Sequence, residues 1–115
     1  MQRILIVDDN EDIREVLGTY VAKEGFEPVV AKDGFEALDL FKKANPAVVL
    51  LDVMMPGMDG YALTAEIRAA KMELPILMVT AKDQFGDMQK AFHAGTDDYM
   101  IKPINVKELV LRVEA

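Results

Sequence analysis

Short apolar runs alternate with longer amphipathic segments along the whole of this chain. The runs are Ile4–Val7, Val29–Ala31, Ala47–Leu51, Ile76–Val79 and Tyr99–Ile101. A brief run in which every residue is apolar is typical of a strand that is buried on both faces, as in a parallel sheet. The pattern therefore predicts five strands, each separated from the next by a stretch long enough for a helix.

The segments that follow the runs show the spacing of amphipathic helices. In the first of them the apolar residues recur at i, i+3, i+4, i+7 and i+8, as Ile13, Val16, Leu17, Tyr20 and Val21. Residues that can cap a helix open the segments at Asn10, Asp33, Asp59, Asp83 and Asn105. The pattern is weakest after Asp83, and Gly25 stands where the first helix should end. Five helices are therefore expected, one after each strand.

Five strand–helix units in series predict an α/β fold with a doubly wound parallel sheet, as a single (βα)5 domain over residues 1–115. Pro28 falls within the second strand, and proline is tolerated mainly at a sheet edge. Asp97 and Asp98 precede the short fifth strand, which indicates the other edge. These assignments favour the flavodoxin-like strand order 2-1-3-4-5. Because the last predicted helix stops abruptly at Ala115, we expect this domain to be part of a longer chain.

The composition narrows the classes of function. The 115 residues carry a formal net charge of -7 with a pI of about 4.6. Nucleic-acid binding needs clustered Lys and Arg, so this domain is not expected to bind DNA or RNA itself. The absence of Cys excludes disulfides and thiolate metal sites. No apolar run approaches the roughly 20 residues that cross a bilayer, and no secretion signal is visible. We therefore expect no membrane partner and a cytoplasmic location.

Polar residues follow four of the strands at the point where each one ends. Asp8 and Asp9 follow the first strand, and Asp52 follows the third. Thr80 and Lys102 follow the fourth and the fifth. In an open parallel sheet, ligands bind beyond the carboxyl ends of the strands where the strand order reverses, here between strands 1 and 3. One aspartate after a strand is most often a turn or cap residue, but five polar residues at one edge indicate a functional site.

The residue types at this edge favour metal-dependent phosphoryl transfer. Clustered carboxylates repel one another unless a cation compensates them, and oxygen ligands without Cys or paired His favour Mg2+ or Ca2+ over zinc. Lys102 adds positive charge, Thr80 adds a hydroxyl, and Asp52 is the best candidate for a carboxylate nucleophile. The nearby acids Glu11 and Asp12 are assigned instead to the positive end of the first helix.

Four motifs resemble the receiver domain of two-component response regulators: ILIVDDN, LLDVMMPGMDG, ILMVTA and GTDDYMIKP. They occur in the family's order, and the resemblance covers the whole chain. It implies that a histidine kinase donates a phosphoryl group to this domain. It also implies a signalling domain that catalyses its own aspartyl phosphorylation and dephosphorylation, and not an enzyme acting on other substrates.

The resemblance gives each matching residue a role. Asp52 is similar to the phospho-acceptor aspartate of the family. Asp8 and Asp9 resemble the acidic pair that holds Mg2+, together with Asp52 and the main-chain carbonyl of Met54. Lys102 resembles the lysine that pairs with a phosphoryl oxygen.

The resemblance also implies a conformational switch. Thr80 resembles the hydroxyl residue that bonds the phosphoryl group, and Tyr99 resembles the aromatic residue that turns inward when Thr80 moves. The surface of the fourth helix, fifth strand and fifth helix would change. The segment GTDDYMIKPINVKELVLRV is similar to the winged-helix transcription-factor branch, whose receivers dimerise through that surface. This implies control of transcription, with DNA bound only by a separate output domain. Met88 departs from that branch, which commonly has a basic residue there.

Two alternatives share parts of this pattern. A haloacid-dehalogenase-type phosphatase also forms an aspartyl phosphate with Mg2+ on a doubly wound sheet. That family spaces its acids Asp-x-Asp after the first strand, whereas Asp8 and Asp9 are adjacent and Asn10 follows them. A flavodoxin-like flavin binder would present hydroxyls to its phosphate, and acids at this place would repel it. Both are less favoured than the receiver domain.

Overall fold

The computed structural model describes residues 2–52, 55, 57–70, 74–80 and 98–101, with the backbone alone for residues 79–80 and 98–101. Its elements are, in chain order, β1 (Arg3–Val7), α1 (Glu11–Lys23), β2 (Glu27–Ala31), α2 (Gly34–Ala44), β3 (Val48–Leu51), α3 (Gly60–Ala70), β4 (Ile76–Thr80) and β5 (Asp98–Ile101). Each strand covers one of the predicted apolar runs, with small shifts at the ends. The helices expected after β4 and β5 fall outside the described residues.

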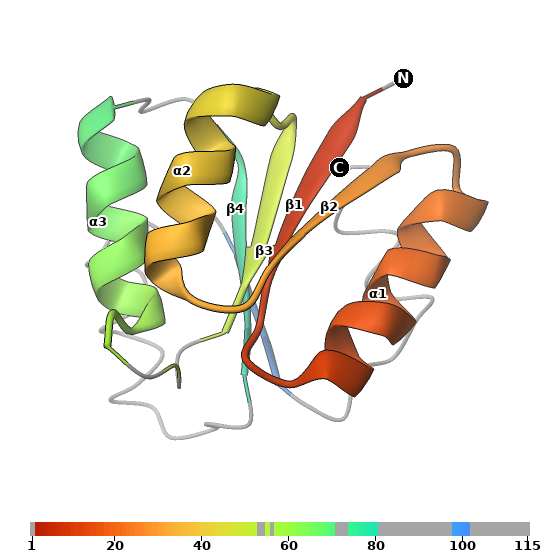
Figure 1. Cartoon of the computed structure of the whole chain (residues 1–115), viewed down its shortest axis with the longest axis horizontal. Helices are drawn as coiled ribbons and strands as arrows, with labels where there is room; N and C mark the ends of the chain where they lie inside the picture. The colour runs from red at the N-terminus through yellow and green to blue at the C-terminus, as the bar shows by residue number, and fades with distance from the viewer. Residues whose placement is uncertain (1, 53–54, 56, 71–73, 81–97, 102–115) are drawn as a thin grey trace.

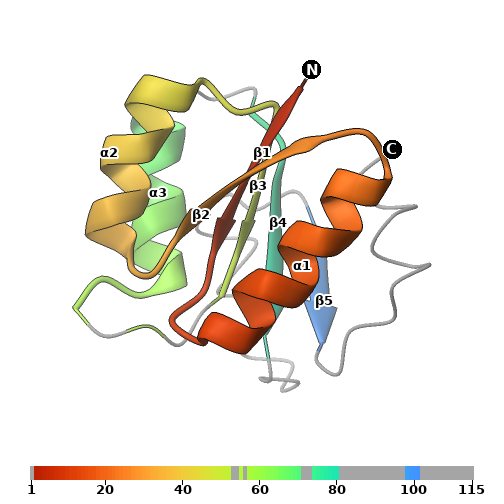
Figure 2. The same ribbon diagram turned by 45° about the vertical axis from the view of Figure 1, so that its right-hand side comes forward.

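The strands form one parallel sheet in the order β2-β1-β3-β4-β5. Helix α1 covers one face of the sheet, and α2 and α3 cover the other (Figure 1). Figure 2 shows the same arrangement from a second direction. The predicted doubly wound parallel sheet of flavodoxin-like type is confirmed. Pro28 lies in β2, which is an edge strand among the described elements, so its missing N–H is tolerated.

Burial on both faces explains why β1 is apolar at every position after Arg3. Successive side chains of a strand point to opposite faces of the sheet. Leu5 and Val7 join the hydrophobic cluster under α2 and α3, and Ile4 and Ile6 join the cluster under α1. All four are at most 1% exposed. The sheet is thus packed between two hydrophobic clusters, which hold the strands in place on both faces.

Polar caps determine where the described helices begin. Three of the five predicted capping residues lie in the described part of the chain, and each accepts a hydrogen bond from the main-chain N–H three residues further on: Asn10 from Ile13 at 3.2 Å, Asp33 from Glu36 at 2.8 Å and Asp59 from Ala62 at 2.8 Å. Such a bond satisfies one of the N–H groups that the first turn of a helix leaves without an intrahelical partner. The caps therefore specify the residues at which α1, α2 and α3 begin.

Candidate metal centre

The register between β1 and β3 brings two aspartates together. Val7 pairs with Leu51, so the residues that follow them, Asp8 and Asp52, leave the sheet side by side. The N–H of Asp52 donates to the carbonyl of Val7 at 3.0 Å, which extends the ladder by one hydrogen bond. The two carboxylates therefore lie at the carboxyl edge, where the strand order reverses.

A third carboxylate completes the cluster. One carboxylate oxygen each from Asp8, Asp9 and Asp52 lies within 4.8 Å of the other two. Asp8 and Asp52 are buried, at 3% and 6% exposure, whereas Asp9 is exposed. Burial removes water that would otherwise screen the repulsion between the charges. The cluster is thus suited to binding a cation, which would offset the repulsion between the carboxylates. It is open to solvent at Asp9.

The donor set fits a hard divalent cation. Mg2+ and Ca2+ take carboxylate and carbonyl oxygens, whereas zinc sites are built mainly from Cys and His. The chain has no Cys and one His. Mg2+ typically keeps several waters and uses one or two carboxylates, together with phosphate oxygens of the substrate. Two buried carboxylates beside an exposed one match that requirement.

Main-chain hydrogen bonds hold Asp8 in place. Its N–H donates to the carbonyl of Ala31 at 3.2 Å, and its Oδ1 accepts from the N–H of Asn10 at 2.9 Å. Asn10 is also the cap of α1, and Glu11 and Asp12 are exposed in the first turn of that helix. The four acids after β1 therefore form two pairs with different surroundings, and the metal-binding role of the first pair stays a prediction. Two belong to the cluster, and two lie at the positive end of the helix.

Sequence reasoning did not identify Arg14 as a residue of this region. Its Nη1 donates to the main-chain oxygen of Asp8 at 2.7 Å. The contact joins a helix to the end of the preceding strand, so it follows no regular sequence spacing. It depends on the tight turn through Asp9 and Asn10. A basic residue among the acids that open α1 is the only signal in the sequence.

The other predicted site residues are described in part or not at all. Thr80 is the last residue of β4, beside β3, so its backbone lies at the same edge as the cluster. Tyr99 lies within β5. Met54, Lys102 and Met88 lie outside the described residues, as do the predicted fourth and fifth helices. The structure therefore brings together the three aspartates and places the strand end that carries Thr80.

The fold and the cluster define a class of protein: a flavodoxin-like α/β domain with a cluster of three carboxylates where the strand order reverses. The family model of the response regulator receiver domain matches residues 4–114. The chain therefore belongs to the receiver domains of response regulators, which act in two-component signalling. Domains of this family receive phosphoryl groups from histidine kinases, and they are signalling modules and not conventional enzymes.

Solved structures of such proteins match nearly the whole chain. The chemotaxis protein CheY4 of Vibrio cholerae is 31% identical with a TM-score of 0.94, and the match covers 99% of this chain and 97% of that chain. The receiver domain of the Francisella response regulator 1452 is 32% identical with a TM-score of 0.92, over 99% and 94%. The response regulator protein TrrA of Thermotoga maritima, in complex with Mg2+ and BeF, is 37% identical with a TM-score of 0.91, over 99% and 97%.

Membership of this family distinguishes between the three functional hypotheses that the sequence suggested. It supports the receiver domain and gives no support to the phosphatase or the flavin binder. The matched structures include a chemotaxis protein, so they establish the family without singling out the winged-helix branch. Within the part of the chain that the structure describes, no helix is long and apolar enough to cross a membrane.

Proposed function

We propose that this receiver domain accepts a phosphoryl group on Asp52 from the phosphohistidine of a histidine kinase. The observation that carries the proposal is the convergence of three carboxylates, with one oxygen of each within 4.8 Å of the others, where the strand order reverses. Asp52 follows β3 singly, whereas Asp8 and Asp9 follow β1 as a pair. Asp52 is therefore assigned as the nucleophile, and the pair is assigned to the metal.

The proposed Mg2+ site consists of Asp8, Asp9, Asp52 and the main-chain carbonyl of Met54, with Asp9 as a direct ligand and Asp8 acting mainly through water. The three carboxylates supply the hard oxygen atoms that this ion prefers. TrrA of Thermotoga maritima, 37% identical to this chain, was solved in complex with Mg2+ and BeF. When bound, the ion supplies positive charge that offsets the charge of the carboxylates and of the transferring group. The role of Met54 rests on the resemblance to the family.

In the proposed reaction, a carboxylate oxygen of Asp52 attacks the phosphorus of the phosphohistidine in line. The new O–P bond forms as the N–P bond breaks, and the electron pair of that bond stays on the imidazole nitrogen. Lys102 pairs with one phosphoryl oxygen, and the hydroxyl of Thr80 donates to another. Water later attacks the acyl phosphate, which releases inorganic phosphate and restores the Asp52 carboxylate. The domain thereby catalyses its own phosphorylation and dephosphorylation.

The proposed output is a two-state change in the surface of the fourth helix, β5 and the fifth helix. Thr80 moves toward the phosphoryl group, and Tyr99 turns inward to fill the space. The similarity of residues 95–113 to the winged-helix branch supports three further parts of the proposal. They are a homodimer through that surface, control of transcription, and DNA binding by a separate output domain. A cytoplasmic location belongs to the same proposal.

Incubation with Mg2+ and acetyl phosphate tests acceptance on Asp52. Intact-mass spectrometry should show one added phosphoryl group in the wild type and none in Asp52→Asn. Asp39→Asn is the matched control, because Asp39 is an exposed acid of α2 whose partner is Lys43 at 3.0 Å. It should accept the group as the wild type does. An adduct that persists in Asp52→Asn would contradict the proposal, as would a folded, Mg2+-bound wild type that forms none.

A further inference from the structure

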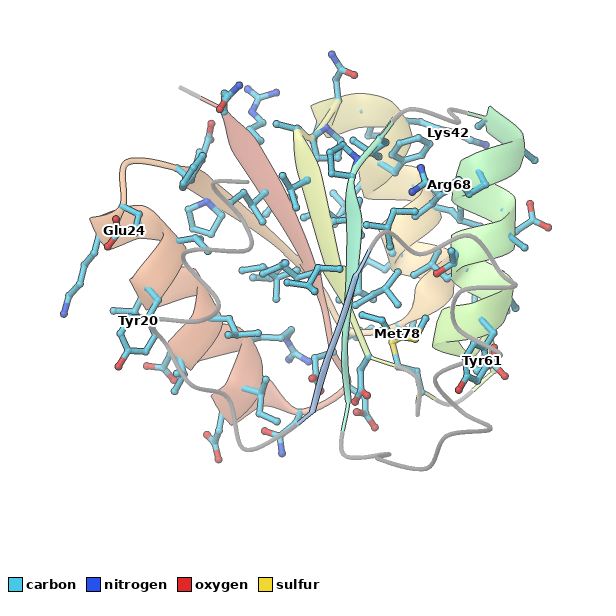
Figure 3. All side chains as sticks on the ribbon, turned by 180° about the vertical axis from the view of Figure 1, so that it is seen from behind. Tyr20, Glu24, Lys42, Tyr61, Arg68 and Met78 are labelled. Atoms are coloured by element: carbon cyan, nitrogen blue, oxygen red, sulfur yellow. The ribbon has the colours of Figure 1, made fainter. Side chains whose placement is uncertain are left out.

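Three arginines in the described part of the chain each donate a hydrogen bond to a main-chain carbonyl. Arg3 donates to Ala44 at 3.0 Å, and Arg68 donates to Leu74. These two carbonyls lie shortly before β3 and β4, at the amino ends of the strands. Figure 3 shows Arg68 near the carboxyl end of α3, on the side of the molecule where the strands begin. Arg14 makes the same kind of contact at the opposite edge of the sheet, where the acidic cluster lies.

Arg14 reaches back from α1 to the end of β1. Its own N–H donates to the carbonyl of Asn10 at 3.1 Å, in the first turn of the helix. Its guanidinium donates through Nη1 to the carbonyl of Asp8 at 2.7 Å, in a partly buried position. A charged donor makes a stronger hydrogen bond than a neutral one. The bond therefore ties the start of α1 to the first acid of the cluster.

The contact to Asp8 also constrains Asp9. The peptide unit between them is planar, so fixing the carbonyl of Asp8 fixes the direction in which the Cα of Asp9 lies. The N–H of Asp8 is held separately by Ala31 at 3.2 Å. Asp9 is exposed, so packing does little to orient its side chain. The Arg14 bond thus helps to orient the peptide link between the paired acids, together with the bond from the N–H of Asn10 to Oδ1 of Asp8 at 2.9 Å.

We propose that Arg14 is a positioning residue of the metal centre. Through the carbonyl of Asp8, it holds the Asp8–Asp9 peptide in the orientation that brings both carboxylates to Asp52. The inference rests on the proposed function, because it assigns Arg14 to the Mg2+ site of that function. Arg14 acts on the ligands and not on the phosphoryl group.

An electrostatic role and a positioning role of Arg14 predict opposite effects of its removal on the affinity for Mg2+. A positive side chain near the cluster repels a divalent cation, so removing that charge alone would tighten Mg2+ binding. Loss of a contact that orients a ligand weakens metal binding instead. The sign of the change in Mg2+ affinity therefore distinguishes a positioning role from a purely electrostatic one.

Calorimetric titration with Mg2+ of the wild type, Arg14→Met and Arg3→Met tests the proposal. Arg14→Met should raise the Kd about tenfold, at the lower end of the range for loss of a contact that supports a metal ligand. Arg3→Met is the matched control, since it removes the same charge and the same kind of carbonyl contact at the other edge of the sheet. It should keep the wild-type Kd. Saturating Mg2+ should restore the rate at which Arg14→Met is phosphorylated by acetyl phosphate.

Each other outcome overturns the inference. An unchanged or lower Kd in Arg14→Met would show that Arg14 does not position the ligands, and a rate that saturating Mg2+ fails to restore would show an effect outside the metal site. If Arg14→Met does not fold, Arg14→Gln serves instead, because it keeps a polar side chain that ends two atoms short of the guanidinium nitrogen that donates to Asp8. A wild-type Kd in that variant would refute the proposal. A folded wild type that binds no Mg2+ would refute the proposed function as well, so the two failures are distinguishable.

Discussion

Asp8 and Asp9 are adjacent in the sequence but have different surroundings in the structure. Asp8 continues the direction of β1 and is 3% exposed, whereas Asp9 is exposed where the chain turns toward α1. The Oδ1 atom of Asp8 accepts a hydrogen bond from Asn10 at 2.9 Å. Replacing Asp8 would therefore disturb a partly buried hydrogen bond. Replacing Asp9 changes the charge of the cluster with little effect on packing.

Asp9→Asn should stabilise the metal-free domain and weaken Mg2+ binding. One of the three charges is removed, and relief of repulsion at this separation amounts to about 1 kcal/mol in water. Urea unfolding in EDTA measures the stability, and calorimetric titration measures the affinity for Mg2+. Asp39→Asn removes an exposed charge on α2 and should leave the Mg2+ affinity unchanged. A metal-free Asp9→Asn domain that is less stable than the wild type would contradict the repulsion argument.

At the scale of the elements, the glycines of α1 and α2 differ in how much room surrounds them. A Cβ added at Gly18, within α1, would meet the Cβ of Pro28 at 3.7 Å, which is an ordinary contact. A Cβ added at Gly34, the first residue of α2, would lie 2.8 Å from the Cβ of Met58. Gly34 thus allows α2 to begin directly against Met58. Gly18 has no comparable neighbour.

Alanine at these two positions should have opposite effects on stability. Gly18→Ala should stabilise the domain by up to about 1 kcal/mol, because it restores helix propensity without a clash. Gly34→Ala should destabilise it by about 1–3 kcal/mol, because the Cβ of Met58 cannot move away without a backbone shift. Equilibrium urea denaturation of both variants measures the difference. Equal stabilisation by both substitutions would contradict a close approach between the start of α2 and Met58.

The elements also show which local patterns are reliable. Asn10, Asp33 and Asp59 cap helices as predicted, because capping is a hydrogen bond to a group three residues away and is visible in the sequence. Strand ends were less well predicted. β2 begins at Glu27, two residues before the apolar run, because pairing with β1 extends it through residues that are not fully buried. The ends of a strand thus depend on the strand it pairs with, which the hydrophobic pattern of the sequence does not show.

At the scale of the whole molecule, Mg2+ should stabilise the folded domain by mass action. Asp8 and Asp9 follow β1, and Asp52 follows β3, so the complete site exists only in the folded chain. A ligand that binds only the folded state at 100 times its Kd adds about 2.7 kcal/mol. Urea unfolding at increasing Mg2+, with ionic strength held by NaCl, measures this gain. Asp52→Asn should reduce it, and a stability independent of Mg2+ would contradict the site.

Sequence patterns alone predict the described strands and helices, the parallel sheet and the family. Runs that are apolar at every position specify strands buried on both faces, and polar caps specify helix starts, because both signals are local. The order of the strands could be predicted from Pro28 and from the acids before β5, which mark the two edges. The aspartates of the site were identified because each follows a strand, and carboxyl ends share one edge.

The contacts between these residues follow from the assembled fold and are not visible in the sequence. The register of Val7 with Leu51 brings Asp8 beside Asp52. Asp8 is buried, whereas its neighbour Asp9 is exposed. The bond from Arg14 to the Asp8 carbonyl depends on the turn between β1 and α1, and no periodic pattern indicates it. Distances between residues far apart in the chain follow from packing the sheet between two cores. They are properties of the assembled fold and not of any local segment.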